Sequence, residues 1–343
     1  MQSLDDIITK LKLMYKSYSL WQIVLMGLHK ISVKILGPKQ YPVFPKKYGD
    51  DHVSEIVGKA IDSSKPIMIS RFGAVEISTM FNFLGVTNPH HSIISYIRDN
   101  EPQWWWNEGI RRCMTDNAGF FPSTDENLLR FGNLMIESMK HIDILTSWQN
   151  LEYRFRDYLN CKEFINYVQI DPFWAKIPWT YHLRGKKVLV VHPFADEIQH
   201  QYKENRENLF SNPMILPQFT LITLKAVQSI GGKSQFKDWF EALIFMEEEI
   251  SKIDFDVCLL GCGAYGMPLA AYVKKMGKQA IHIGGSLQLL FGIRGSRWED
   301  PNYGKDITNE YGRYPSLFNE YWIRPSANSQ VQGAEKVDNG CYW

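Results

Sequence analysis

The chain has 343 residues, and its 38 Lys and Arg residues nearly balance its 37 Asp and Glu residues, so the formal charge is +1. This balance argues against a protein that binds nucleic acid through a large basic face. Hydrophobic residues make up 45% of the chain and charged residues 22%, which excludes disorder over most of its length.

Five cysteines are spread through the chain without a C-x-x-C pair, which is typical of reduced thiols rather than of disulfides or a zinc site. No secretory signal pattern precedes them. The longest apolar run, residues 20–28, is shorter than the ~20 residues that span a bilayer. We therefore expect a cytoplasmic protein.

Residues 1–38 have apolar positions at helical spacing, which predicts an amphipathic helix. Six lysines are opposed by only two aspartates up to Lys39, a local net charge of +4. Such a helix either packs on its own domain or on a second copy of the chain, or lies on the anionic inner face of the plasma membrane. Residues 37–51, with three prolines, are predicted to be a linker.

Beyond the linker, short β-rich runs alternate with helical segments, which predicts an α/β fold with a Rossmann-like, mostly parallel sheet and flanking helices. The expected strands are residues 66–70, 142–146, 164–170, 187–191, 219–224, 255–260 and 280–283. The expected helices are residues 52–62, 76–83, 126–139, 197–209, 237–252 and 267–276.

From Trp298 onward this alternation gives way to Pro, Gly, Asn and aromatic residues. We expect an irregular arm that wraps the domain or a second copy, because exposing so many rings would be costly. The predicted organisation is therefore a helix and linker at residues 1–50, a Rossmann-like catalytic domain at residues 51–297 and the arm at residues 298–343.

Glycine turns follow the strands expected at residues 255–260 and 280–283. In the first turn, backbone amides and a helix N-terminus can bind a phosphate. The second lacks the acidic residue that a dinucleotide-binding protein would have there, so a nucleotide or sugar diphosphate is favoured over NAD or FAD. The alternative is a structural role, in which the glycines of the first turn only allow strand and helix to pack closely. The residues are Gly261, Gly263, Tyr265 and Gly266, then Gly284 and Gly285.

An earlier turn, after the strand expected at residues 66–70, carries Arg71, Phe72, Gly73 and Glu76. Open α/β sheets bind ligands at the carboxyl ends of their strands. Arginine can bind a phosphate through two hydrogen bonds, and glutamate can bind a metal or accept a proton. The alternative is an ion pair between Arg71 and Glu76 on the surface.

Other polar residues follow the strands expected at residues 187–191 and 219–224. The histidine is expected to donate to a phosphate or to act as a base, or else to have a structural role. The cations would counter phosphate charge, and the carboxylates are candidates for the base that deprotonates an acceptor. The residues are His192, Asp196, Glu197, Arg206 and Lys225.

Trp105 and Trp106 belong to a run of three tryptophans, and Phe120 follows shortly after it. Rings of this kind can stack on the apolar face of an acceptor sugar. Burial of two of the three tryptophans is the alternative.

Residues 71–76 and 261–285 together resemble the GT-D fold glycosyltransferases, which are bacterial enzymes of surface-polysaccharide and glycoprotein assembly. The resemblance follows the order of elements over roughly residues 60–290 and is specific only in these two segments. It implies transfer of a sugar from a nucleotide-diphosphate donor, such as a UDP- or GDP-sugar, to a hydroxyl of a glycan or lipid-linked glycan.

In that family the first turn reads Arg, aromatic, Gly, Asp, any residue, Glu, and its two carboxylates are associated with a divalent metal and the donor diphosphate. Arg71, Gly73 and Glu76 keep these places, but Ala74 stands where the family has Asp. If Mg²⁺ or Mn²⁺ is bound, Glu76 is the ligand that remains. A nucleotide-dependent oxidoreductase and an inactive nucleotide-sugar-binding subunit are the alternative functions.

Overall fold

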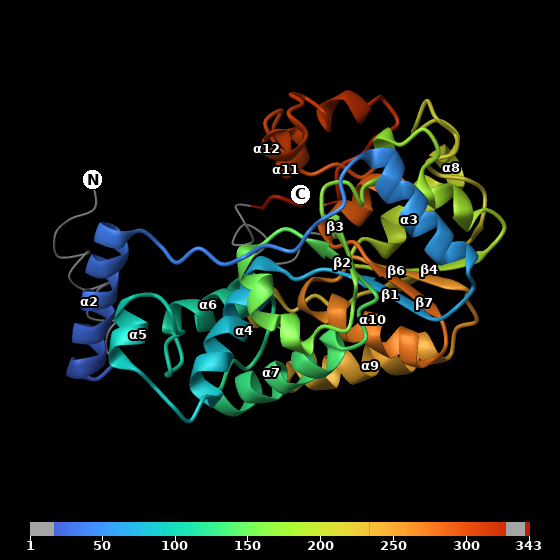
Figure 1. Ribbon diagram of the computed structural model, residues 1–343. Helices are drawn as coiled ribbons and strands as arrows, with labels where there is room; N and C mark the ends of the chain where they lie inside the picture. The colour runs from blue at the N-terminus through green and yellow to red at the C-terminus, as the bar shows by residue number, and fades with distance from the viewer. Residues whose placement is uncertain (1–16, 233, 327–339) are drawn as a thin grey trace.

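The structure is a computed structural model that describes residues 17–232, 234–326 and 340–343. Seven strands form one sheet in which every hydrogen-bonded pair of strands is parallel (Figure 1). The predicted α/β fold is therefore confirmed, with a fully parallel sheet in place of a mostly parallel one. The strands are β1 (Ile67–Ser70), β2 (Ile144–Ser147), β3 (Glu163–Asn166), β4 (Lys187–His192), β5 (Thr220–Lys225), β6 (Val257–Leu260) and β7 (Gln279–His282).

The strand order is β3-β2-β1-β7-β6-β4-β5. After β1 the chain adds β2 and β3 on one side, and it then crosses to the other side of β1 to form β4. Open α/β sheets bind ligands outside the carboxyl ends of the strands at such a reversal. The topology therefore points to the carboxyl ends of β1, β7, β6 and β4.

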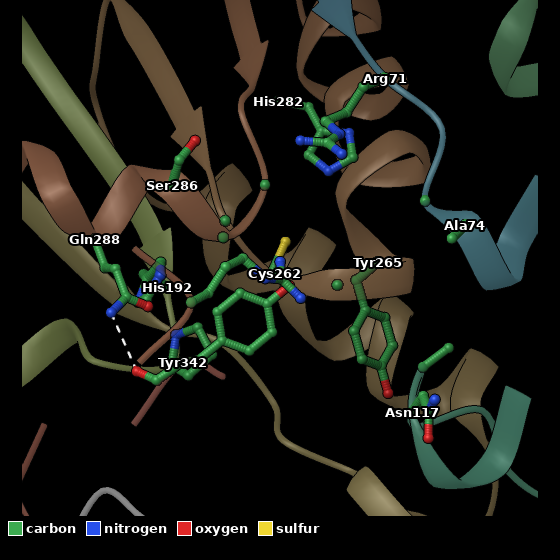
Figure 2. A pocket seen from close by; sticks show the side chains of 18 of the residues that line it. Arg71, Ala74, Asn117, His192, Cys262, Tyr265, His282, Ser286, Gln288 and Tyr342 are labelled. Atoms are coloured by element: carbon green, nitrogen blue, oxygen red, sulfur yellow. Dashed lines mark hydrogen bonds between the residues drawn. The ribbon is translucent and has the colours of Figure 1, made fainter. Parts of the chain in front are cut away.

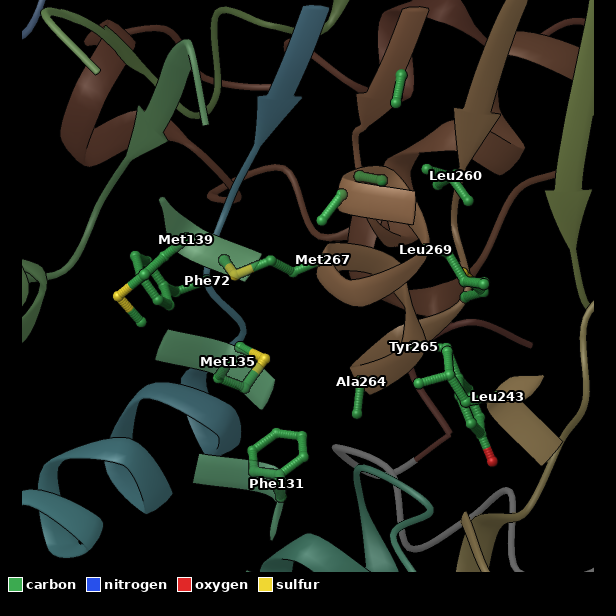
Figure 3. Close-up of a cluster of buried hydrophobic side chains, with 14 of the residues drawn as sticks. Phe72, Phe131, Met135, Met139, Leu243, Leu260, Ala264, Tyr265, Met267 and Leu269 are labelled. Atoms are coloured by element: carbon green, nitrogen blue, oxygen red, sulfur yellow. The ribbon is translucent and has the colours of Figure 1, made fainter. Parts of the chain in front are cut away.

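Helices cover both faces of the sheet (Figure 1). Alternate residues of β4 point to opposite faces, as expected for a strand: Val188 and Val190 pack in the core beneath α3 and α8, whereas Leu189 and Val191 pack in the core beside α4, α7, α9 and α10 (Figure 3). These helices are α3 (Asp50–Asp62), α4 (Ala74–Thr87), α7 (Asp125–Met139), α8 (Ala195–Asn205), α9 (Trp239–Ser251) and α10 (Gly266–Lys275).

A separate group of helices lies at one end of the molecule (Figure 1). There α2 (Leu20–Leu36) packs on α5 (Ile93–Ile97), and α6 (Glu108–Asp116) packs on α4. Residues 1–16 of the predicted amphipathic helix lie outside the described residues, and α2 confirms the helix beyond them. In the ranges that the structure describes, no helix combines the length and the apolar character needed to cross a membrane.

The C-terminal arm packs on the face of the sheet that α3 and α8 cover. Its rings Trp298, Tyr314 and Trp322 are buried in the core of that face. In the described part of the arm, irregular backbone and short helical segments are held there by aromatic packing. Its short helical segments are α11 (Ser296–Glu299), α12 (Lys305–Thr308) and η7 (Pro315–Leu317).

Replacing Gly132 by Ala is expected to destabilise the fold. A Cβ atom at Gly132 in α7 would lie 2.2 Å from the ring of Phe83 in α4, so the two helices would have to move apart. Overpacking of this kind costs about 1–3 kcal/mol of unfolding free energy. Urea denaturation measures the loss.

Gly27→Ala is the matched control, because Gly27 also lies in a helix but a Cβ atom there would meet nothing within 4 Å. That variant should be neutral or more stable by up to about 1 kcal/mol, from helix propensity alone. Equal stability of the two variants would contradict the close packing of α4 on α7.

Candidate functional site

A pocket of about 480 Å³ opens at the carboxyl edge of β1, β7, β6 and β4, where the topology reverses (Figure 2). The first residues after each of these strands contribute to its wall. Segments far apart in the sequence, including the two turns of the family resemblance, therefore meet in one place. Residues singled out from the sequence that line it are Arg71, Gly73, Glu76, His192, Gly261, Gly263, Tyr265, Gly284 and Gly285.

Arg71, the first residue after β1, is a half-buried cation on this wall. Its guanidinium carbon lies 5.3 Å from the ring centroids of both Trp148 and Tyr167, close enough for cation–π attraction. Trp148 is held in turn by a hydrogen bond from its indole nitrogen to the carbonyl of Phe72, at 2.9 Å. Arg71 Nη1 donates to the carbonyl of Ile283 at 3.4 Å. Among the described residues no carboxylate forms an ion pair with Arg71. The guanidinium group is therefore held in position without a directly bonded counter-ion.

Sequence reasoning missed both rings that hold Arg71. Trp148 directly follows β2 and Tyr167 directly follows β3, so the rule that found Arg71 after β1 would have found them too. The expected strand at residues 142–146 stopped one residue before β2 ends. The expected strand at residues 164–170 ran past the end of β3 and included Tyr167.

Glu76 lies in the first turn of α4 and is 9% exposed. Its carboxylate folds back over Gly73, where a Cβ atom would lie 2.0 Å from Glu76 Oε2, and it accepts a hydrogen bond from its own backbone amide. Burial raises the pKa of Glu76, and the nearby charge of Arg71 opposes that rise. Gly73 is therefore required by Glu76, whose carboxyl group occupies the N-terminus of α4.

Glycine is needed at different positions of the later turns for different structural reasons. A Cβ atom at Gly261 would lie 2.6 Å from the His192 ring, and one at Gly266 would lie 2.2 Å from His282 Nε2. These two glycines make room for histidines, and their role in binding a phosphate stays a prediction. Gly263 differs, because its φ of +57° favours glycine and a Cβ atom there would meet nothing within 4 Å. It lines the pocket together with Gly261, Cys262 and Tyr265.

Both histidines of the pocket are buried and uncharged at neutral pH. The amide of Phe194 donates to His192 Nδ1 at 3.0 Å, which leaves the proton of the neutral ring on Nε2. Burial lowers the pKa of His192, and that of His282, to about 3. His282 Nδ1 is 3.1 Å from Ser70 Oγ. As a neutral ring, His192 can donate one hydrogen bond from Nε2, and its role as a base stays a prediction.

Asp171 is the second buried carboxylate of the pocket, and sequence reasoning missed it. It accepts hydrogen bonds from Tyr314 Oη and Ser286 Oγ, each at 2.7 Å. Burial raises its pKa to about 6, although both hydrogen bonds act in the opposite direction. Asp171 directly follows the strand expected at residues 164–170, so its place after a strand was a usable signal.

Part of the remaining wall comes from the C-terminal arm and the residues just before it, and part comes from the loops that contain Asn117 and Ser229. Arg297 donates to Tyr342 Oη at 3.1 Å, and Gln288 Nε2 donates to the Tyr342 carbonyl, also at 3.1 Å (Figure 2). A Cβ atom at Gly285 would lie 2.1 Å from the Tyr342 ring, so Gly285 is needed for this packing. No sequence signal placed the arm here, because its position depends on tertiary contacts alone. Tyr303, Tyr314 and Trp343 complete this side.

Four predicted charged residues lie outside the pocket. Lys225 at the end of the edge strand β5 pairs with Asp196 at 2.9 Å, and both side chains are largely exposed. Arg206 pairs with the adjacent glutamate. Glu197 accepts from the hydroxyl of Ser326 at 2.8 Å. The shared edge of the sheet brings together the central strand ends but not these outlying groups.

The aromatic residues proposed for an acceptor sugar are placed elsewhere. Phe120 is fully buried in the core, and Trp106 is buried too, so neither can offer a ring face to a sugar. Trp105 packs with its ring centroid 5.5 Å from that of Trp21 in α2. Phe72 is likewise core, and only its backbone supports the pocket (Figure 3).

Ala74 leaves Glu76 without a second carboxylate in its turn, and the carboxyl group of Glu76 is already folded over Gly73. In the described ranges no three His, Cys, Asp or Glu side chains gather in a way that could hold a metal ion. The residues present do not fit a preassembled divalent-metal site. Dependence on Mg²⁺ or Mn²⁺ stays a prediction, and no chemical step is derived through a metal.

Neither protein-family models nor curated proteins match this sequence. Two solved structures are similar. One, described as the selenomethionine-substituted domain of unknown function 1792, is 14% identical, with 89% of this chain and 96% of that chain covered and a TM-score of 0.31. The other, described as that highly conserved domain with a distinct glycosyltransferase fold, is 15% identical, with 88% and 96% covered and a TM-score of 0.32. Similarity at this level says nothing about the activity of this chain. The residues of the pocket are the basis for a proposed function.

Asp171→Asn is expected to change how stability depends on pH. Because burial raises the folded-state pKa from 3.8 to about 6, the folded protein holds this proton more tightly than the unfolded chain does. The stability that protonated Asp171 contributes to the fold is fully present below about pH 4 and is lost as the pH rises through 6. A difference of about two units between the folded and unfolded pKa values corresponds to ~3 kcal/mol of unfolding free energy.

Relative to the wild type, Asp171→Asn should gain about 1–3 kcal/mol of unfolding free energy between pH 4 and pH 7. Urea denaturation at several pH values measures this, with Asp157→Asn as the exposed control. Parallel pH profiles for wild type and Asp171→Asn would show that the pKa of Asp171 is not raised.

Proposed function

We propose that this chain is a glycosyltransferase that moves a sugar from a nucleotide-diphosphate donor to a hydroxyl of a glycan or lipid-linked glycan. The observation that carries the proposal is Arg71. It is a cation without a described carboxylate partner, fixed between Trp148 and Tyr167 in a pocket at the reversal of a parallel sheet. An anionic ligand satisfies such a group, and phosphate oxygens match the geometry of a guanidinium.

The donor diphosphate is assigned to the space between Arg71 and the turn that contains Gly263. That turn leads into α10, where the Gly266 amide donates to the Gly263 carbonyl and Pro268 has no amide, so the amides of the turn itself are the proposed donors. The N-terminus of α4 is less suitable because the carboxyl group of Glu76 occupies it. His192 Nε2–H supplies one further neutral donor to the pocket.

The sugar is assigned to the side that the arm closes. Rings such as Tyr303 and Tyr342 suit the apolar face of a sugar, and Asp171 with its hydroxyl partners suits sugar hydroxyl groups. β7 ends in His282 and carries no acidic residue at its end to bind a dinucleotide ribose. The geometry therefore favours a sugar nucleotide over a nicotinamide cofactor.

In the reaction, the bond between the anomeric carbon and the phosphate oxygen breaks, and a bond to the acceptor oxygen forms. Arg71 and the backbone amides of the turn that contains Gly263 stabilise the charge that develops on the departing diphosphate. The acceptor hydroxyl must lose its proton, and Glu76 is the proposed base. Its raised pKa brings the carboxylate closer to the working pH than that of an exposed glutamate.

A thermal-shift screen of nucleoside diphosphates, their sugars and NAD tests the proposal, because a ligand that binds only the folded protein raises its melting temperature. At least one nucleoside diphosphate is expected to stabilise the wild type. A shift with NAD alone, or with no nucleotide at all, would rule out the proposed donor. Repeating the screen with Mn²⁺ and with EDTA tests metal dependence in the same experiment.

Arg71→Ala should weaken binding of the stabilising nucleoside diphosphate by about ten- to a hundredfold. Hydrogen bonds to charged groups contribute about 1.5–3 kcal/mol each, and the variant loses them. Isothermal titration calorimetry measures the affinity. Arg206→Ala is the matched control, since Arg206 is an arginine outside the pocket, and its affinity should equal that of the wild type.

Glu76→Gln should lower turnover at least about tenfold, equivalent to ~1.4 kcal/mol in the barrier, and leave nucleoside-diphosphate affinity within about twofold. The amide keeps the shape of the side chain but cannot accept the proton. Release of nucleoside diphosphate during transfer measures turnover. Glu126→Gln changes an exposed glutamate in the first turn of α7 and should be fully active. Full activity of Glu76→Gln would remove Glu76 as the base.

A further inference from the structure

We propose that α2 docks this protein on the surface of an anionic membrane. One face of α2 is apolar and exposed along the whole helix: Val24 is 53% exposed, Leu28 44%, Ile31 57% and Ile35 74%. Their spacing of four, three and four residues places them on the same side of a helix. A continuous apolar stripe of this kind on a surface marks an interaction site.

The opposite side of α2 is packed, so the direction of the apolar stripe is fixed. Leu25 is buried, and His29 stacks on Tyr96 of α5 with ring centroids 4.9 Å apart. Trp21 lies with its ring centroid 5.5 Å from that of Trp105. The stripe therefore lies on the side of α2 that is not packed against α5, and α2 itself lies at one end of the molecule (Figure 1).

The charge of α2 selects the kind of surface. The helix contains Lys30 and Lys34 and no Asp or Glu. With 100° between successive residues, both lysines fall along one flank of the stripe. Asp99 contacts the imidazole of His29 at 3.9 Å on the packed side of the helix. Apolar residues beside lysines match a bilayer with anionic headgroups better than they match a neutral surface.

The shape of the helix suits the membrane plane. At 17 residues α2 is roughly 25 Å long, and an amphipathic helix of this kind lies in the interface with its apolar face in the acyl boundary. Trp21, half-exposed at the start of α2, is the residue type that prefers this depth.

Vesicle flotation of the full chain tests this inference, with phosphatidylcholine vesicles compared to vesicles that contain phosphatidylglycerol. The wild type should bind the anionic vesicles at least tenfold more strongly than the neutral ones. The double variant Leu28→Ser/Ile31→Ser should lose at least tenfold in binding, and Lys34→Glu should lose several-fold. The double variant Ile177→Ser/Ile244→Ser is the matched control, since it removes two equally exposed apolar residues elsewhere, and it should bind like the wild type.

Circular dichroism and nucleoside-diphosphate binding verify that each variant is folded, and neither readout depends on the membrane. Equal binding to neutral and anionic vesicles, or unchanged binding of the α2 variants, would overturn the inference. Sedimentation provides a second check. A wild-type dimer that Leu28→Ser/Ile31→Ser converts to a monomer, without vesicle binding by either, would assign the stripe to a second copy of the chain and reject the membrane. The outcome is independent of the proposed sugar transfer.

Discussion

The site depends on one cation at the carboxyl edge of the sheet, Arg71. No carboxylate of the described residues forms an ion pair with it, although its charge acts on the buried carboxyl groups of Glu76 and Asp171. Arg71 is half-buried, and the faces of Trp148 and Tyr167 stabilise its charge without cancelling it. Desolvating a charge costs free energy unless it is paired, so the fold maintains a position that an anion would stabilise. The two neighbouring histidines are neutral, which leaves Arg71 as the dominant positive group on its side of the pocket.

The glycines around this position show how packing and binding share one motif. Gly73 admits the Glu76 carboxyl group, and Gly261 and Gly266 admit the two histidine rings. A pattern that suggests a phosphate loop in the sequence is thus largely a set of close approaches by polar side chains. Gly263 alone combines a left-handed backbone with open space. Binding of a diphosphate therefore depends on a short stretch of amides together with Arg71, rather than on the entire motif.

Local patterns predicted the sheet well because its central strands are short, largely buried runs between turn residues. They also predicted that Arg71, Glu76 and Gly263 would meet, since parallel strands end at one edge. Trp148 and Tyr167 were missed through errors of a few residues in strand boundaries. Tyr342 could not have been found from the sequence, because the arm has no periodic pattern and its place depends on packing against Gly285. Arg206 and Lys225 were wrongly expected to face the pocket. The order of the strands in the sheet decides which strand ends are central, and local patterns do not reveal that order.

The pocket and α2 are connected through α4. This helix begins at Gly73 on the pocket wall, and its buried Asn82 donates to the carbonyl of Trp105 at 3.0 Å. Trp105 in turn packs against Trp21 of α2. Because each of these contacts is buried or aromatic, the direction of the apolar stripe and the mouth of the pocket are fixed relative to each other. A membrane that holds α2 would therefore hold the pocket in one orientation, and a lipid-linked acceptor would approach it from a constant side.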